Sequence, residues 1–323
     1  MKSKITKRIL EKLHQPELIE ILSEKLSPAD YQSIMLEIAK ARSKNLTPKN
    51  VLEQYNENRF VKISNVSPVK MMEFDLHAFS LLPSHYEALE LSPVAPLGTV
   101  SAIAPVDQNN IVATIRNTEL VSDATNVLAL ECAQQRKELL DKNPKSNDKI
   151  NLAASHRVTR AQTFDEPAAF PHFKIFNMCS AGRDEGNYKF EIHTLLEHIT
   201  YYLDLLNSNP KNIFSVAGVR LVIIALNEKA KNWIEELLIP TLVSKFQSLE
   251  YSIEEQYDQS QTYYSDLRFN IYAKESKGEE FFLIDGGFTD WTQKLLSNKK
   301  ERLLISGIGS ERLLFVFGNN NAW

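Results

Sequence analysis

Tyr263-Tyr264-Ser265-Asp266-Leu267-Arg268-Phe269 is followed by Ile284-Asp285-Gly286-Gly287-Phe288-Thr289-Asp290 and then by Ser306-Gly307-Ile308-Gly309-Ser310-Glu311-Arg312-Leu313. This order predicts a strand after a tyrosine pair, a Gly-Gly turn, and an apolar strand that runs through two glycines into a helix. The two glycines permit close approach to the backbone, and an arginine at the helix start can hold a terminal phosphate. The segment therefore predicts a phosphate site built on a sheet.

A second polar segment lies upstream, where the predicted strand Phe173–Cys179 runs into Ala181-Gly182-Arg183-Asp184-Glu185-Gly186-Asn187-Tyr188-Lys189-Phe190-Glu191. An arginine at the lip of a loop can neutralise a phosphate through its planar guanidinium group. An aromatic side chain that returns from the loop can stack on a purine. The alternative is a charged turn beside a core phenylalanine.

These segments, in this order and spacing, resemble the catalytic core of class II aminoacyl-tRNA synthetases. The most similar branch contains the histidyl-tRNA synthetases and the regulatory subunit of ATP phosphoribosyltransferase, and the resemblance implies binding of ATP and Mg²⁺. By resemblance to motif 2, Arg183 would meet the α-phosphate, Glu185 would lie beside adenine and Phe190 would stack on the base. By resemblance to motif 3, the γ-phosphate site would comprise Gly307, Gly309, Glu311 and Arg312.

The amino-acid-reading part departs from the histidyl pattern. In that branch the tyrosine pair closes an Arg-Gly-Leu-Asp-Tyr-Tyr signature, and Gln259 stands here at the arginine position. A neutral amide cannot replace the electrostatic stabilisation that an arginine gives during acyl transfer, so activation of histidine by the usual route is not expected. The resemblance implies that the acid substrate is held by Tyr263, Tyr264, Gly286, Gly287, Gln259 and Arg157.

Two further polar segments precede the Phe173 strand. Leu152–Gln162 stands where class II enzymes carry a loop that contacts the substrate amino group. That loop is normally acidic, whereas this segment is basic, which suits an anionic ligand. Arg157 is the candidate of this segment for the substrate pocket. A surface helix is the alternative. In Thr114–Thr125, Ser122 or Asp123 would cap a helix, or the segment would line the site or a dimer interface.

The composition is that of an ordinary globular protein. The net charge of −4 and pI of about 6.0 give no general basic field, so binding of tRNA is not expected. Cys132 and Cys179 lack metal-ligand spacing, and His193 and His198 lack the His-Glu-x-x-His pattern, so no metal site is expected. The chain shows neither a signal-peptide pattern nor a membrane-spanning apolar run, which favours a cytoplasmic location.

The predicted fold is α+β, with an antiparallel class II synthetase-like sheet flanked by helices over residues 58–323. Residues 1–57 form a small helical region, in which Ser27-Pro28 and Thr47-Pro48 mark helix starts. Strands are also expected at Phe60–Ile63, Thr99–Ile103 and Ile111–Ile115. A homodimer is implied by the resemblance.

Three functional interpretations follow. The first is an ATP-dependent enzyme that adenylates a small carboxylate or amino acid for an acceptor other than tRNA. The second is a non-catalytic regulator that binds a small ligand and a partner enzyme, like the regulatory subunit named above. The third is a tRNA-binding accessory, which the acidic pI disfavours. Because few residues follow Arg312, an anticodon-binding domain is not expected.

Overall fold

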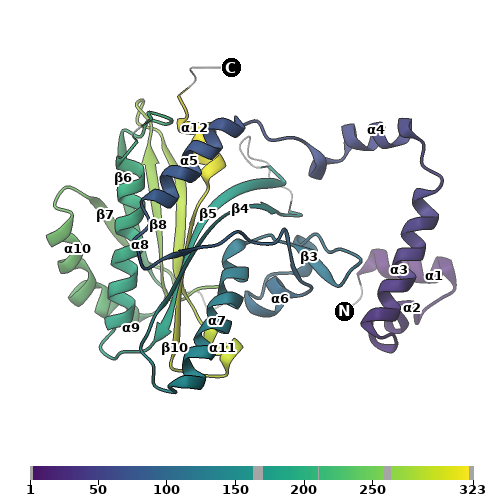
Figure 1. Cartoon of the computed structure of the whole chain (residues 1–323), viewed down its shortest axis with the longest axis horizontal. Helices are drawn as coiled ribbons and strands as arrows, with labels where there is room; N and C mark the ends of the chain where they lie inside the picture. Colours follow the sequence, from purple (N-terminus) through teal and green to yellow (C-terminus); the bar gives the residue numbers. More distant parts are fainter. Residues whose placement is uncertain (1–2, 163–169, 210, 258–262, 320–323) are drawn as a thin grey trace.

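The computed structural model describes residues 3–162, 170–209, 211–257 and 263–319. At its centre lies an eight-stranded sheet of order β1-β4-β5-β10-β9-β8-β6-β7, and β2 and β3 form a separate pair (Figure 1). The strands are β1 (Glu87–Ala88), β2 (Val94–Pro96), β3 (Thr118–Leu120), β4 (Ile150–Thr159), β5 (His172–Arg183), β6 (Gly218–Ala225), β7 (Glu250–Glu255), β8 (Ser265–Lys274), β9 (Glu280–Thr289) and β10 (Glu301–Ile308).

The six inner strands, from β4 to β6, pair with one another in antiparallel orientation, while the edge strands β1 and β7 pair in parallel with β4 and β6. The predicted α+β fold with a largely antiparallel sheet is confirmed. Gly286 and Gly287 lie inside β9 rather than at the predicted turn, because both residues pair with β10 and β8.

Helices cover both faces of this sheet. Side chains alternate along each strand, so on β10 Leu304 and Ile308 pack under one set of helices while Leu303 and Ile305 pack under the other. The first set is α5 (Pro68–Ser80), α8 (Lys189–Asn207), α9 (Glu228–Trp233), α10 (Ile239–Lys245) and α12 (Ser310–Phe317). The second set is α6 (Thr99–Ile103), α7 (Ala124–Lys142) and α11 (Trp291–Leu296). These three helices share a core cluster with Cys179 of β5.

The central helix α8 is fastened to the sheet by a buried histidine. His198 has no exposed surface, and its Nε2 and Nδ1 lie 3.0 and 2.7 Å from the Oγ atoms of Ser180 and Ser306. The Tyr202 hydroxyl lies 3.0 Å from the same Ser306 Oγ. Burial lowers the pKa of His198 to about 3, so the imidazole is neutral and structural at physiological pH.

The N-terminal helices stand apart from the sheet (Figure 1). Ser27 and Thr47 accept hydrogen bonds from the first turns of α3 and α4, which confirms both predicted helix starts. Asn117 Nδ2 donates to Pro28 O at 3.1 Å and so connects α3 to the β3 region. The helices of this region are α1 (Lys4–Leu13), α2 (Leu18–Glu20) with a π-helical turn (Ile21–Lys25), α3 (Pro28–Ser43) and α4 (Pro48–Glu57).

Several predicted elements are wrong. Thr99–Ile103 is the helix α6 instead of a strand, because the buried Glu119 carboxylate accepts hydrogen bonds from the amides of Gly98 and Val100 at 2.8 and 3.0 Å and satisfies the helix start. Arg59–Val61 is a 3₁₀ turn, and Ile111–Ile115 supplies only one isolated bridge. The basic segment expected as a loop or surface helix is β4, the neighbour of β5. No described helix has the length and apolar character needed to span a bilayer.

Candidate functional site

A row of polar side chains crosses the sheet beyond the part covered by α7. Asn177, Gly307, Asp285 and Asn270 are successive cross-strand partners on β5, β10, β9 and β8, so the side chains of the two asparagines and the aspartate share one face. Gly307 keeps the row open in the middle, because a Cβ at this position would lie 2.8 Å from Asn177 Oδ1. These four residues, called the polar row below, form the floor of the candidate site.

The tyrosine pair stands beside the polar row. Tyr264 donates its hydroxyl to Asp285 Oδ2 at 2.9 Å, and Tyr263 donates to Asp123 Oδ2 at 2.6 Å. Their rings pack edge to face with centroids 4.8 Å apart. Gly287 makes this arrangement possible, since a Cβ there would lie 2.7 Å from the ring of Tyr264. Two carboxylates are thus brought to the site through two phenols.

A guanidinium and an aromatic ring complete the site at the β4–β5 side. Arg160 lies just beyond the end of β4, and its Nε donates to Ser122 O at 3.1 Å. Its guanidinium lies 5.1 Å from the ring centroid of the half-buried Phe173. Asp123, the next residue after Ser122, caps α7 through Oδ1 and presents Oδ2 to Tyr263. An acidic and a basic side chain therefore both lie at the start of α7.

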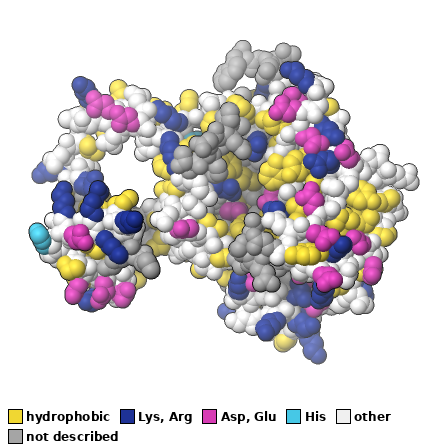
Figure 2. All heavy atoms as spheres, turned by 180° about the vertical axis from the view of Figure 1, so that it is seen from behind, with side chains coloured by type: hydrophobic (Ala, Val, Ile, Leu, Met, Phe, Trp, Pro, Cys, Tyr) yellow, Lys and Arg dark blue, Asp and Glu magenta, His cyan; other side chains and the backbone are white. Residues whose placement is uncertain are grey.

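Burial shapes the electrostatics of the site. It raises the pKa of Asp285, while the hydrogen bond from Tyr264 and the charge of Arg268 act in the opposite sense. The pKa values of Tyr263 and Tyr264 are raised well above the usual range, first by burial and then by the neighbouring carboxylates, so both phenols stay protonated donors. Figure 2 shows a hollow on this face with acidic and basic side chains at its bottom.

Several buried polar atoms of the site have no hydrogen-bond partner within the described part of the chain. Buried polar groups are normally paired, so a local cluster of unpaired atoms indicates a place where a ligand or water supplies the partner. The atoms concerned are Asp285 Oδ1, Asn270 Oδ1, Arg268 Nε, Thr289 Oγ1 and Trp291 Nε1.

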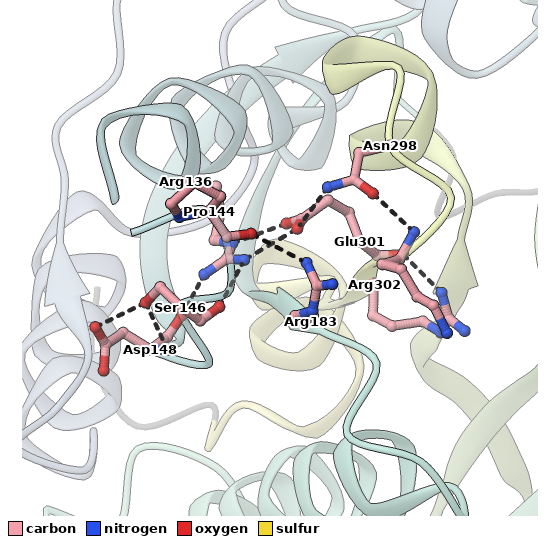
Figure 3. A network of polar contacts seen from close by, with 9 residues as sticks. Arg136, Pro144, Ser146, Asp148, Arg183, Asn298, Glu301 and Arg302 are labelled. Atoms are coloured by element: carbon pink, nitrogen blue, oxygen red, sulfur yellow. Dashed lines mark hydrogen bonds and ion pairs between the residues drawn. The ribbon is translucent and has the colours of Figure 1, made fainter. Parts of the chain in front are cut away.

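The residues that resemblance assigned to motif 2 lie elsewhere. Arg183 pairs with Glu301 and Phe176 with Ile308, so Arg183 lies seven residues along β10, roughly 23 Å, from the Gly307–Gly309 end. Arg183 and Arg312 therefore cannot bind one triphosphate as predicted. The Arg183 guanidinium lies near Pro144 O, at the edge of a network around the buried Arg136–Glu301 ion pair (Figure 3).

Glu185 and Phe190 are also outside the site. The segment after Arg183 leads into α8 instead of a returning strand, and Phe190 in the first turn of α8 is completely buried. Its ring packs on Gly182, where a Cβ would lie 2.7 Å from the ring, so no purine can stack there. Glu185 forms an ion pair with Lys149 at 3.6 Å. The alternative reading of a turn beside a core phenylalanine is the correct one.

The motif 3 segment divides between the two faces. Glu311 is buried and accepts from Lys174 N and Arg157 Nη1, both at 2.9 Å, and from Ser64, so it holds the chain together instead of facing a nucleotide. Arg157 is therefore turned toward α12, away from the predicted acid pocket. Arg312 is half-buried next to Gly309 at the start of α12, on the sheet end near the polar row.

The remaining assigned residues have mixed positions. Gly286 faces the side of the sheet that α8 covers, where a Cβ would lie 2.5 Å from the ring of Phe269. Tyr263, Tyr264 and Gly287 lie at the site. Gln259 falls outside the described residues.

Sequence reasoning missed several residues that form the site. Asp123 was interpreted mainly as a helix cap, and it is also a site carboxylate. Arg160 is the basic residue of the Leu152–Gln162 segment that reaches the site, in place of Arg157. Asp285 carried a usable signal, since it alternates with the apolar Ile284 and Phe288 in a strand pattern. The acid of the site thus comes from Asp123 and not from the Leu152–Gln162 segment, where the class II loop normally carries one.

The sequence matches no protein-family model and no curated protein. In structure, the fold is that of the class II aminoacyl-tRNA synthetase catalytic core. The apo histidyl-tRNA synthetase of S. aureus has a TM-score of 0.56 at 15% identity, over 79% of this chain and 69% of that one.

Two other similar structures belong to the same histidyl branch. An ATP phosphoribosyltransferase regulatory subunit/histidyl-tRNA synthetase from Bacillus halodurans has a TM-score of 0.54 at 13% identity, covering 80% of this chain and 82% of that one. A histidine–tRNA ligase subunit from Alicyclobacillus acidocaldarius has a TM-score of 0.54 at 9% identity, covering 78% and 94%. Histidyl-tRNA synthetases and the regulatory subunit are thus among the proteins that this chain resembles in fold.

Proposed function

We propose that this chain binds ATP and an amino acid and joins them as an aminoacyl adenylate. The observation that carries the proposal is the meeting of Asp123, Arg160 and the tyrosine pair beside the polar row. A carboxylate next to a guanidinium suits a ligand that carries an ammonium group beside a carboxylate or phosphate. The class II fold supports ATP as the second substrate.

Each residue has a defined role in this proposal. Arg160 binds the α-phosphate, and Phe173 offers its ring to the adenine base. Asp123 binds the substrate ammonium group, with Tyr263 fixing its orientation. A substrate carboxylate oxygen then attacks the α-phosphorus, the bond to the bridging oxygen breaks, and pyrophosphate leaves. A bound Mg²⁺ would neutralise charge on this leaving group. Arg160 lowers the barrier by opposing the charge that grows on the phosphate.

The test is amino-acid-dependent exchange of labelled pyrophosphate into ATP, screened over the amino acids. Arg160→Met and Asp123→Asn should lower the exchange rate by about a hundredfold, the scale for removing one transition-state contact. Asn still caps a helix, so Asp123→Asn should fold. Arg183→Met is the matched control and should leave the rate unchanged. Absence of exchange with every amino acid would remove the adenylation proposal.

A regulator is the second candidate. Its support is the likeness to the ATP phosphoribosyltransferase regulatory subunit/histidyl-tRNA synthetase from Bacillus halodurans, of which this fold covers 82%. In that role the site binds an amino acid without turnover and transmits its occupancy to a partner enzyme. Calorimetry that shows amino-acid binding, with no pyrophosphate exchange, would favour it. Size measurement in solution would test the homodimer that the resemblance implies.

A further inference from the structure

Asp285 is half-buried at the far side of the site, and one of its two carboxylate oxygens is buried and has no described partner. Tyr264 donates to Oδ2 at 2.9 Å, while Oδ1 has no partner among the described residues. A buried acceptor left without a donor costs about 1–3 kcal/mol, more when it is charged. A hydrogen-bond donor from a ligand would therefore stabilise this position, since no described residue supplies one.

Asn270 offers a second acceptor next to the first. It is 9% exposed and its Oδ1 is also unpartnered. Asn270 and Asp285 are direct cross-strand partners, which places their Cβ atoms about 5 Å apart on one face. Two neighbouring acceptors at this spacing suit one group with several N–H donors, such as a primary ammonium or a guanidinium.

Arg268 limits the alternatives. Its Nη2 donates to Gln256 Oε1 at 2.7 Å, so the end of its guanidinium is already engaged. An anionic ligand group placed here would gain the remaining Nε of Arg268 but would face the charge of Asp285 and leave both oxygen acceptors unpaired. A cationic group pairs both acceptors, and the charge of Asp285 offsets the repulsion that this group meets from Arg268.

The distance from Phe173 to the two acceptors is longer than an amino acid alone. Phe173 lies four residues along β5 from Asn177, which is in line with Asp285 and Asn270, and β9 and β8 lie two and three strands from β5. At the usual spacings along and between strands, Phe173 is roughly 16 Å from Asp285 and roughly 20 Å from Asn270. This span suits an amino acid joined to a nucleotide, with Phe173 at one end and Asp285 and Asn270 at the other. The tyrosine pair lies between them, since Tyr263 contacts Asp123 and Tyr264 contacts Asp285.

Building on the proposed function, we infer that Asp285 and Asn270 recognise the side chain of the bound amino acid, and that this side chain is long and cationic. The site thus selects a basic amino acid, carrying a primary ammonium or a guanidinium group, over neutral and acidic ones. Because burial raises the pKa of Asp285, binding should weaken in acid as this carboxylate becomes protonated.

The experiment is calorimetric titration of the protein, with and without ATP, using L-lysine and L-arginine against L-norleucine, L-citrulline and L-glutamate. At least one basic probe should bind about tenfold or more tightly than its neutral counterpart. Asp285→Asn should reduce that preference to about twofold or less. Glu280→Gln, on the same strand but paired with Arg220, is the control and should preserve it.

The outcomes separate this inference from the proposed function. Equal or tighter binding of norleucine, citrulline or glutamate overturns the cationic subsite, as does an Asp285→Asn protein with unchanged preference. Pyrophosphate exchange with a neutral amino acid would then still support adenylation. Conversely, lysine or arginine binding without any ATP binding keeps the subsite and removes adenylation. Tyr264→Phe serves as a second variant. It removes the hydrogen bond that lowers the pKa of Asp285, so binding of the basic probe should weaken at a higher pH than in the parent.

Discussion

The two ends of the same sheet both carry arginines and carboxylates, but these groups differ in how far their polar atoms are paired. At the Arg183 end, Arg136 and Glu301 are both fully buried and joined at 2.8 Å, and Arg136 also donates to Asp148 O at 2.6 Å. At the other end, the half-buried Asp285 and the buried Asn270 each have a buried oxygen atom that no described group pairs. The comparison teaches that burial alone does not mark a ligand site. Single unpaired buried atoms also occur elsewhere, such as Glu191 Oε2 near the Arg183 end, so the distinguishing feature is the cluster of unpaired atoms beside the polar row.

The largest expected effect comes from breaking the satisfied end. Arg136→Met leaves Glu301 as a buried charge without its partner, which should lower the free energy of unfolding by about 3–5 kcal/mol. Urea unfolding followed by circular dichroism measures this loss. The double variant Arg136→Met with Glu301→Leu should recover much of the stability, because two apolar groups replace the pair. An Arg136→Met protein as stable as the parent would show that the ion pair does not stabilise this end of the sheet.

The next largest effect is expected on the pH dependence of stability, from His198 on the face of the sheet that α8 covers. Its pKa is about 3 when folded, against about 6.5 unfolded, so only the unfolded chain takes up the proton as the pH falls. Between pH 7.5 and 5 the protein should lose about 2 kcal/mol more unfolding free energy than His198→Gln does. Urea titrations at both pH values check this, and identical pH slopes for the two proteins would contradict it.

Two phenylalanines sharpen the comparison for nucleotide binding. Phe173→Leu removes the ring beside Arg160 and should weaken ATP binding about tenfold, the size of one base–aromatic contact. Phe190→Leu changes a core residue and should cost about 1 kcal/mol of stability with ATP binding intact. Fluorescence titration with a labelled ATP analogue distinguishes them. The reverse pattern would restore the motif 2 assignment of Phe190.

The smallest effect concerns Asp285 itself. A buried carboxylate with a raised pKa costs stability while it is ionised, so Asp285→Asn should raise the free energy of unfolding at pH 7 by about 1 kcal/mol. This change has the opposite sign to that at Arg136. Thermal unfolding without ligand measures it, and a destabilised Asp285→Asn protein would mean that Asp285 serves the fold.

The sequence was sufficient for the fold and for part of the site. Helix caps at Ser27 and Thr47, the tyrosine pair and the strand–glycine–helix order are local patterns, and local patterns survive folding. The pairing of β5 depends on contacts between residues far apart in the sequence. The local sequence around Arg183 predicts a phosphate ligand, but the strand register places this residue beside Glu301. Asp123 and Asp285 meet only through the tyrosine pair, which no spacing in the chain reveals.

The central claim is that ligands bind at the Arg160 end of the sheet and not at the Arg183 end. Isothermal titration of ATP into Arg160→Met and Arg183→Met tests it most directly, since both changes remove one guanidinium and keep a long side chain. We predict that Arg160→Met loses at least about tenfold in affinity and that Arg183→Met stays within about twofold of the parent. Loss of ATP binding in Arg183→Met, with Arg160→Met unaffected, would contradict the account.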